Sequence, residues 1–173
     1  MLGCKPSDKK QWIEGREGIY LRSLQPKKDS VLLATKDSRE EWIQVYQNII
    51  ASTDAHAWVA MHLEEPIGQL DVYLIKAGEL GNYFEARSND AVVQYRHLQK
   101  HGAHKEILLV FMQYYFAHRD AGLLYAQANI YDDSACRLYE SVGCIFQQNL
   151  MLSSQAVSLY LMTPAKCREQ LKQ

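Results

Sequence analysis

Apolar and polar residues alternate along several short stretches of the chain. Residues 19–24 (IYLRSL) follow this period of two and predict a first strand. Residues 58–63 and 67–75 are β-rich runs on either side of Glu64-Glu65-Pro66, so they predict an antiparallel hairpin with that polar connector as its loop. Further strands are expected over residues 91–95, 123–130, 144–147 and 157–162.

Other apolar residues recur at helical spacing. Ser38 and Glu41 fit a capping box, and the residues behind them predict a helix with one face on a core: Trp42, Val45, Tyr46, Ile49 and Ile50. Residues 107–117 (ILLVFMQYYFA) are too continuously apolar for a surface helix, so we expect a helix packed closely on a sheet. A buried strand is the competing interpretation. Gly122 is expected to close that helix as a C-terminal glycine.

A last helix is expected over residues 135–142, capped by Asp133 or Ser134 and ended by Gly143. The expected order is strand, helices, hairpin, strand, helix, strand, helix, strand, strand. Such an order predicts an α+β or mixed α/β layer architecture with a largely antiparallel sheet. A chain of 173 residues suits one domain. We expect that domain over residues 18–165, between an N-terminal polar extension (1–17) and a C-terminal tail (166–173).

Composition narrows the class of protein. The formal net charge is −1, which argues against a nucleic-acid partner because proteins that bind phosphate backbones carry a concentrated basic face. The lysines at positions 5, 9 and 10 are interpreted as a solvated tail. The sequence contains no stretch of about 20 uncharged apolar residues, so no membrane span is predicted. The N-terminus lacks the apolar run of a signal peptide, and the 4 cysteines show no framework spacing, so we expect a protein of the reducing cytoplasm.

One candidate anion site lies between a predicted strand and a predicted helix. The segment is Gln99-Lys100-His101-Gly102-Ala103-His104. A turn there exposes backbone N–H groups at a helix start, where the helix dipole also favours anions. Gly102 would let the backbone approach a phosphate closely. Taken alone, a glycine in a strand-to-helix turn is usually only a turn.

The second candidate segment covers residues 132–146 and contains the short helix expected over residues 135–142. This helix presents Tyr139 and stops at Gly143 before a new strand. In isolation, Leu138 and Tyr139 would be expected to pack inward, with Gly143 as the C-terminal cap.

Together, the two segments give the sequence a resemblance to the GCN5-related N-acetyltransferase (GNAT) superfamily. The family's R/Q-x-x-G-x-G/A motif appears as Gln99-x-x-Gly102-x-His104, and its N-x-x-A-x-x-L-Y-x-x-x-G-F motif appears as Asp132-x-x-Ala135-x-x-Leu138-Tyr139-x-x-x-Gly143-Cys144. The resemblance spans roughly residues 19–162. Three residues depart from the family pattern: His104 stands for a small residue, Asp132 for asparagine and Cys144 for phenylalanine. An imidazole at position 104 could crowd the anion, point away from it, or donate a hydrogen bond to it.

The resemblance implies a fold, an activity and a set of site residues. The implied fold is a three-layer sandwich around a twisted, mostly antiparallel sheet of about six to seven strands with a splayed cofactor strand. The implied activity is acetyl transfer from acetyl-CoA to a primary amine of a small molecule or protein, with Tyr139 as general acid. The implied cofactor-binding residues are Val92, Val93 and Gln94 for the pantetheine, Gln99, Lys100, His101, Gly102, Ala103 and His104 for the pyrophosphate, and Asp132 and Ser134.

Several questions stay open at this stage. Asp71 and Glu85 are candidate general bases. The acceptor pocket is expected from residues 29–56 and 76–90, which contain carboxylates that could attract a cation: Glu40, Glu41, Asp54, Glu79 and Glu85. Polyamines, aminoglycosides and protein N-termini are all open as acceptors, and so is a homodimer.

Two rival interpretations accompany the enzyme hypothesis. The first is a catalytically weak or inactive protein of the same fold that binds acyl-CoA or a partner protein, and His104 motivates it. The second is a metal site, because His97, His101 and His104 would share a face if the helix began early. We set the metal site aside because Gly102 interrupts the run and no carboxylate stands at a matching spacing.

Overall fold

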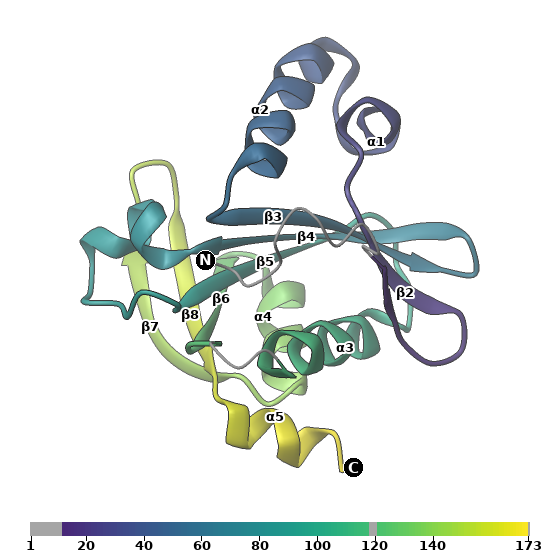
Figure 1. The fold of residues 1–173 in the computed structure, drawn as a ribbon. Helices are drawn as coiled ribbons and strands as arrows, with labels where there is room; N and C mark the ends of the chain where they lie inside the picture. The colour runs from purple at the N-terminus through teal and green to yellow at the C-terminus, as the bar shows by residue number, and fades with distance from the viewer. Residues whose placement is uncertain (1–11, 118–120, 173) are drawn as a thin grey trace.

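The computed structural model describes residues 12–117 and 121–172, which form an eight-stranded sheet covered on both faces (Figure 1). The strand order is β1-β2-β3-β4-β5-β6-β8-β7. The strands are β1 (Trp12–Glu14), β2 (Ile19–Ser23), β3 (Ala55–His62), β4 (Glu65–Leu74), β5 (Ala91–His97), β6 (Leu124–Asn129), β7 (Ile145–Met151) and β8 (Ala156–Met162). The mixed α/β class, the largely antiparallel sheet and the order of the predicted elements are confirmed.

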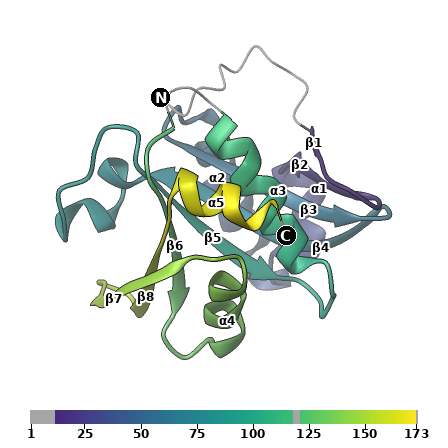
Figure 2. The same ribbon diagram turned by 90° about the horizontal axis from the view of Figure 1, so that it is seen from below.

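The helices divide between the two faces of the sheet. They are α1 (Pro26–Leu33), α2 (Arg39–Ala51), α3 (His104–Ala117), α4 (Asp133–Ser141) and α5 (Pro164–Gln170), with short 3-10 turns over Lys36–Ser38, Ile75–Ala77 and Glu79–Asn82. Helices α1 and α2 lie on one side of the sheet, and α3, α4 and α5 lie on the other, as both ribbon views show (Figures 1 and 2). The predicted three-layer sandwich is therefore present.

The main core lies between the sheet and α3. Ile107, Leu108, Phe111 and Met112 of α3 are almost fully buried there. These positions recur at helical spacing, so the continuous apolar run of residues 107–117 is a helix and the competing strand interpretation is wrong. None of the helices in the two described ranges is both long and apolar enough to cross a bilayer.

Strands β5 and β6 diverge along their length. They pair in parallel only from Ala91↔Leu124 to Val93↔Ala126, although β5 runs on to His97 and β6 to Asn129. All the other strand pairs within the described residues are antiparallel. A gap therefore opens between the two strands beyond Val93, and this gap is where the candidate site lies.

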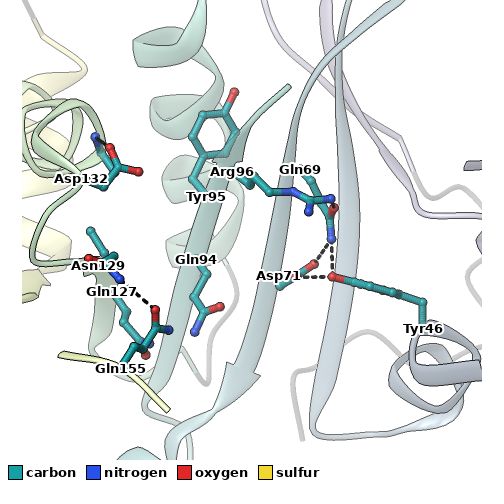
Figure 3. Close-up of a pocket in the computed structure, with 12 residues that line it drawn as sticks. Tyr46, Gln69, Asp71, Gln94, Tyr95, Arg96, Gln127, Asn129, Asp132 and Gln155 are labelled. Carbon is teal, nitrogen blue, oxygen red and sulfur yellow. Dashed lines mark hydrogen bonds between the residues drawn. The ribbon is translucent and has the colours of Figure 1, made fainter. Parts of the chain in front are cut away.

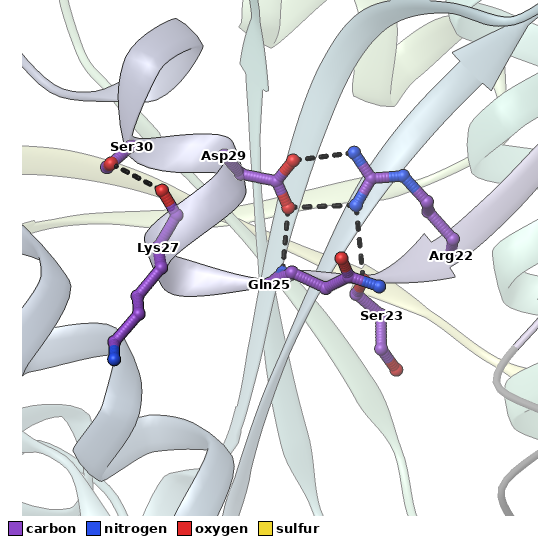
Figure 4. Close-up of polar contacts among 6 residues, drawn as sticks. All are labelled: Arg22, Ser23, Gln25, Lys27, Asp29 and Ser30. Atoms are coloured by element: carbon purple, nitrogen blue, oxygen red, sulfur yellow. Dashed lines mark hydrogen bonds and ion pairs between the residues drawn. The ribbon is translucent and has the colours of Figure 1, made fainter.

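Helices α1 and α2 are attached to the sheet by polar contacts as well as apolar ones. Arg22 of β2 donates two hydrogen bonds to Asp29 of α1, at 2.8 Å to Oδ2 and 2.6 Å to Oδ1, and both side chains are buried (Figure 4). Asp29 also accepts the backbone N–H of Gln25 at 2.7 Å. This bidentate pair fixes the start of α1 over the sheet, which matters because α1 packs against α2, whose Tyr46 lines the site.

Several local predictions were wrong. The β3–β4 hairpin turns at Leu63 and Glu64, which have φ values of 46° and 70°, whereas Glu65 and Pro66 already belong to β4. Ser38 is the N-cap of α2 but makes no capping bond to the helix backbone, because its hydroxyl hydrogen-bonds Thr35 at 2.5 Å.

Two terminal-residue predictions also need correction. The N-cap of α4 is Asp132, whose Oδ1 accepts the Ala135 N–H at 3.0 Å, so neither Asp133 nor Ser134 caps that helix. Gly122 does not have the positive φ of a C-terminal glycine. A Cβ atom there would lie 2.5 Å from the backbone of Asn89, so its small size serves a close approach of two chain segments. Gly143, at φ 84°, does end α4 as predicted.

The chain ends differ from their predicted outlines. Strand β1 lies inside the expected N-terminal extension and adds an edge strand to the sheet. Helix α5 covers most of the expected tail, and its Cys167 is buried in the main core. The lysines at positions 5, 9 and 10 lie outside the described residues.

Candidate functional site

The predicted anion-binding loop leads from β5 into α3. Within it, a Cβ atom added at Gly102 would meet no other atom within 4 Å, so the space above that residue is open. The Ala103 N–H, one of the predicted phosphate donors, is hydrogen-bonded to Nδ1 of His101 at 3.0 Å. Gln99 and Lys100 are exposed. An anion could approach Gly102 freely, but it would compete with the His101 ring for the Ala103 amide.

His104 points into the protein rather than over the loop. Its Nε2–H donates to the Gln99 carbonyl at 2.9 Å, and since a carbonyl can only accept, Nδ1 must accept the Tyr95 hydroxyl proton at 2.6 Å. Burial lowers the pKa of His104, and the nearby His97 and His101 rings lower it further. Of the alternatives for this residue, its burial favours a ring that points away from the proposed anion position. The ring also ties the loop to β5 through Tyr95.

The three histidines cluster without forming a metal site. His97 stacks on His104 with a centroid distance of 4.2 Å and an interplanar angle of 17°. Burial lowers the pKa of His97 as well. Within the described residues, no group of three or more His, Cys, Asp or Glu side chains is placed to hold a metal ion.

Tyr139 lies in the gap between the diverging strands. Its side chain is fully buried, and its hydroxyl accepts the Tyr95 N–H at 2.9 Å and donates to the Gln127 carbonyl at 3.3 Å. One rung of the β5–β6 ladder is the direct bond from the Ala91 N–H to the Leu123 carbonyl, at 3.0 Å. Tyr95 and Gln127 are separated along the chain by the same number of residues as Ala91 and Leu123. The Tyr139 hydroxyl therefore bridges the N–H and the carbonyl that would form a later rung of that ladder. Burial also raises the pKa of the Tyr139 phenol, which therefore keeps its proton at neutral pH.

A cleft of about 290 Å³ opens beside the gap, on the face that carries α1 and α2. It is lined by Tyr46, Gln69, Asp71, Gln94, Tyr95, Arg96, Gln127, Ala128, Asn129, Asp132, Ala135 and Gln155. Polar residues reach this face because they alternate along β4 and β5 with the apolar residues of the main core. Figure 3 shows two groups of side chains, one on each side of Gln94.

The first group is a continuous hydrogen-bond network. Tyr46 of α2 donates to Asp71 Oδ2 at 2.6 Å, and Gln69 Nε2 donates to Asp71 Oδ1 at 2.7 Å (Figure 3). Arg96 donates through Nη2 to Gln69 Oε1 at 2.7 Å and to the Leu33 carbonyl at 3.1 Å. Burial raises the pKa of Asp71, although its two hydrogen bonds and the charge of Arg96 oppose that shift. The network thus presents a carboxylate that is a stronger base than an exposed one.

The second group lines the opposite wall. Asn129 donates to the Gln155 side chain at 3.2 Å, and the Gln127 side chain accepts from Tyr73 at 3.1 Å. Tyr73 also accepts from Gln94 at 3.3 Å, which links the two walls across β5. Asp132 completes this side at the start of α4. These groups are hydrogen-bond donors and acceptors that can orient a polar ligand.

The structure separates the residues predicted for the site. Tyr95 and Asp132 line the cleft, and through them the cleft adjoins the predicted anion loop and Tyr139. Of the two candidate bases, Asp71 lines the cleft, whereas Glu85 is exposed in the loop before β5 and does not line it. Val92 and Val93 lie in the paired part of β5, and Gln94 is the first residue beyond it. Ser134 is exposed on α4. The carboxylates predicted to attract a cationic acceptor are outside the cleft lining: Glu40, Glu41, Asp54, Glu79 and Glu85.

Sequence reasoning missed Tyr46, Gln69, Arg96, Gln127 and Gln155 as site residues. A signal for part of this set was available. Gln69 and Asp71 on one central strand, and Gln94 and Arg96 on the next, are polar at alternate positions, which is unusual for strands in the middle of a covered sheet.

Comparisons with known proteins identify the fold. No protein-family model and no curated protein sequence matches the chain. Solved structures do match. An uncharacterized protein from Bacillus halodurans aligns with a TM-score of 0.80 and 13% identity over 89% of this chain and 88% of that one.

Two further matches are acetyltransferases crystallised with coenzyme A. Aminoglycoside acetyltransferase AAC(6')-Ib aligns with a TM-score of 0.75 and 13% identity over 87% of this chain and 98% of its own. The ribosomal L7/L12 α-N-protein acetyltransferase RimL aligns with a TM-score of 0.65 and 12% identity over 88% and 97%. The chain therefore has the GNAT fold that its motifs predicted.

Proposed function

We propose that this chain is an acyl-CoA-dependent N-acyltransferase that transfers an acetyl group from acetyl-CoA to the primary amine of a small molecule or protein. The observation that carries the proposal is the cleft at the β5–β6 divergence, which holds a carboxylate with a raised pKa beside a free strand edge. The similarity to CoA-bound acetyltransferases supports it.

The residues present suit the donor substrate. The open space above Gly102 and the start of α3 would accept the pyrophosphate, with N–H groups of residues 99–104 as donors once the Ala103 N–H leaves the His101 ring. The edge of β5 beyond Val93, which β6 leaves unpaired, would pair with the pantetheine next to the predicted positions Val92 and Val93. The Tyr95 N–H on this edge is held by the Tyr139 hydroxyl. Asp132 and Ser134 would flank the donor from the N-terminal turn of α4.

In the proposed reaction, Asp71 takes a proton from the acceptor's ammonium group. The neutral amine then attacks the thioester carbon, and Tyr139, releasing the Gln127 carbonyl, supplies a proton to the thiolate as the C–S bond breaks. The nitrogen then gives up its second proton, which restores the Tyr139 hydroxyl. One amide bond forms, one thioester bond breaks, and one proton is released overall. An amine pKa of about 10 makes the base necessary at neutral pH. Glu85 is a weaker candidate for that role because it lies outside the cleft.

The test combines binding and turnover. Calorimetric titration with acetyl-CoA measures donor binding, and thiol release with a panel of primary amines measures transfer. We expect micromolar binding and amine-dependent thiol release, with Asp71→Asn lowering kcat by about a hundredfold or more. Glu85→Gln is the matched control and should keep full activity. Binding without turnover of any amine would instead support an acyl-CoA-binding protein without catalysis, and absence of binding would remove the proposal.

A further inference from the structure

Arg96 places a positive charge in the cleft. It lies on β5 directly opposite Gln69 of β4, and its side chain is exposed at the cleft wall. Both of the hydrogen bonds it donates, to Gln69 Oε1 and to the Leu33 carbonyl, come from Nη2. The guanidinium is thus held in place by one nitrogen, while Nη1 and Nε keep donors that no hydrogen bond within the described ranges uses. A fixed guanidinium with spare N–H donors offers a positive charge and a hydrogen bond that suit a carboxylate.

Gln69 sets the spacing between Arg96 and Asp71. The oxygen of its amide accepts from Arg96, and the nitrogen of the same amide donates to Asp71 (Figure 3). The amide orientation is fixed, because only the oxygen can accept from a guanidinium and only the nitrogen can donate to a carboxylate. A basic carboxylate and a cation therefore stand at the two ends of one amide group. This separation is small enough for a single molecule with an amine and an anionic group a few bonds apart.

The remaining charges of the cleft argue against a polycationic acceptor. Besides Asp71 and Arg96, the only charged side chain in the described lining is Asp132, which already caps α4. A polycation would place an ammonium group near Arg96, where like charges repel. The cleft volume of about 290 Å³ is also small, since typical ligand pockets measure about 300 to 1,000 Å³.

From this arrangement we infer that the acceptor is a small amine of the amino-acid type. Its amine lies against Asp71, and its carboxylate, a few bonds away, pairs with Arg96. The inference rests on the proposed acetyl transfer, and it specifies the class of acceptor. It also assigns Arg96 as the residue that selects the acceptor, a role that none of the sequence motifs indicates.

The test compares matched amines that differ only in the carboxylate. Amino acids are assayed by thiol release against their decarboxylated or amidated counterparts, for example 4-aminobutyrate against propylamine and glycine against glycinamide, with kanamycin as a polycation. We expect kcat/KM to favour the carboxylate-bearing member of each pair by about tenfold to a hundredfold, as a charge-assisted hydrogen bond provides. Arg96→Gln should bring that ratio near one, chiefly through KM, and Arg96→Lys should restore part of it. Arg87→Gln, a control on an exposed arginine outside the cleft, should leave the ratio unchanged.

The two proposals fail in different ways. Turnover that is equal for both members of each pair, or that is best with kanamycin, overturns the acceptor inference while the acyltransferase proposal stands. If no amine is turned over, the acyltransferase proposal fails, and the inference is decided by calorimetric titration of the same amines into the CoA-loaded chain. Binding of amino acids but not of their counterparts, lost in Arg96→Gln, would still support a carboxylate site, and absence of that selectivity would overturn it.

Discussion

The hydroxyl of Tyr139 should contribute to both stability and catalysis, and Tyr139→Phe separates the two. In the wild-type chain this hydroxyl stands between the Tyr95 N–H and the Gln127 carbonyl, in the place of a direct rung between β5 and β6. Phenylalanine keeps the ring that fills the gap but removes the bridge. The Tyr95 N–H and the Gln127 carbonyl then lose a partner in a fully buried part of the site.

The size of the effect follows from those two groups. A buried polar group left without a hydrogen bond costs about 1 to 3 kcal/mol. For a chain of this length, about 1 kcal/mol lowers Tm by roughly 2 to 4 °C, so we expect a fall of about 2 to 12 °C for each group left unpaired. If Tyr139 also protonates the thiolate, kcat should fall by about a hundredfold or more. The Kd for acetyl-CoA should change little, because the hydroxyl is not part of the proposed pyrophosphate loop.

Thermal unfolding, calorimetric titration with acetyl-CoA and steady-state thiol release provide the three readouts. Tyr160→Phe is the control, since Tyr160 is also buried and its ring centroid lies 5.8 Å from that of Tyr139. It should leave kcat unchanged. An unchanged Tm for Tyr139→Phe would falsify the bridging role. A lowered Tm with full kcat would remove Tyr139 from the proton transfer and leave it as a positioning residue between the strands.

Three further predictions concern the loop and one helix end. Gly102→Val should leave Tm nearly unchanged, because no atom lies within 4 Å of the Cβ position. It should weaken acetyl-CoA binding by about tenfold if the backbone approaches a phosphate there. An unchanged Kd for acetyl-CoA would place the anion elsewhere. Gly143→Ala should cost about 1 to 2 kcal/mol in urea unfolding, because φ is 84° and the new Cβ would lie 2.9 Å from Gln170 Cγ. The pKa of His104 is lowered in the folded state, so the unfolded chain binds more protons than the folded chain. The stability that this residue contributes is therefore present above about pH 6.5 and is lost as pH falls through the folded pKa. His104→Gln should therefore flatten the decline in stability between about pH 7 and pH 5, and a decline as steep as in the wild type would contradict this.

The predicted elements were correct where periodicity and length agree. Residues 107–117 are both long and apolar, and the helix over Ile107 and Met112 buries them against the sheet as expected. The hairpin turn was misplaced because Leu63 and Glu64 adopt positive φ without any of the glycine or asparagine residues that usually indicate such a turn. For Gly122, sequence alone cannot distinguish a helix stop from a close contact with a segment more than thirty positions away.

The two halves of the site differed in how far they could be predicted. The donor half depends on contiguous motifs around Gly102 and Tyr139, and such local patterns are visible in the sequence. The acceptor half is assembled from α2, β4 and β5, so Tyr46 and Asp71 become neighbours only after folding. Asp71 was identified as a candidate base but could not be distinguished from Glu85, because position along the chain does not reveal which carboxylate faces the cleft.

Strand β5 connects these two halves through its alternation. Tyr95 and His97 point toward α3, where they contact His104 and the loop that would hold the donor. Gln94 and Arg96, offset by one residue, point to the opposite face and line the cleft proposed for the acceptor. Because side chains alternate strictly along a strand, a one-residue slip of β5 would exchange these sets and destroy both sites at once. The register of β5 therefore matters to both proposed substrates, and the buried rung at Tyr139, next to Tyr95, is well placed to fix it.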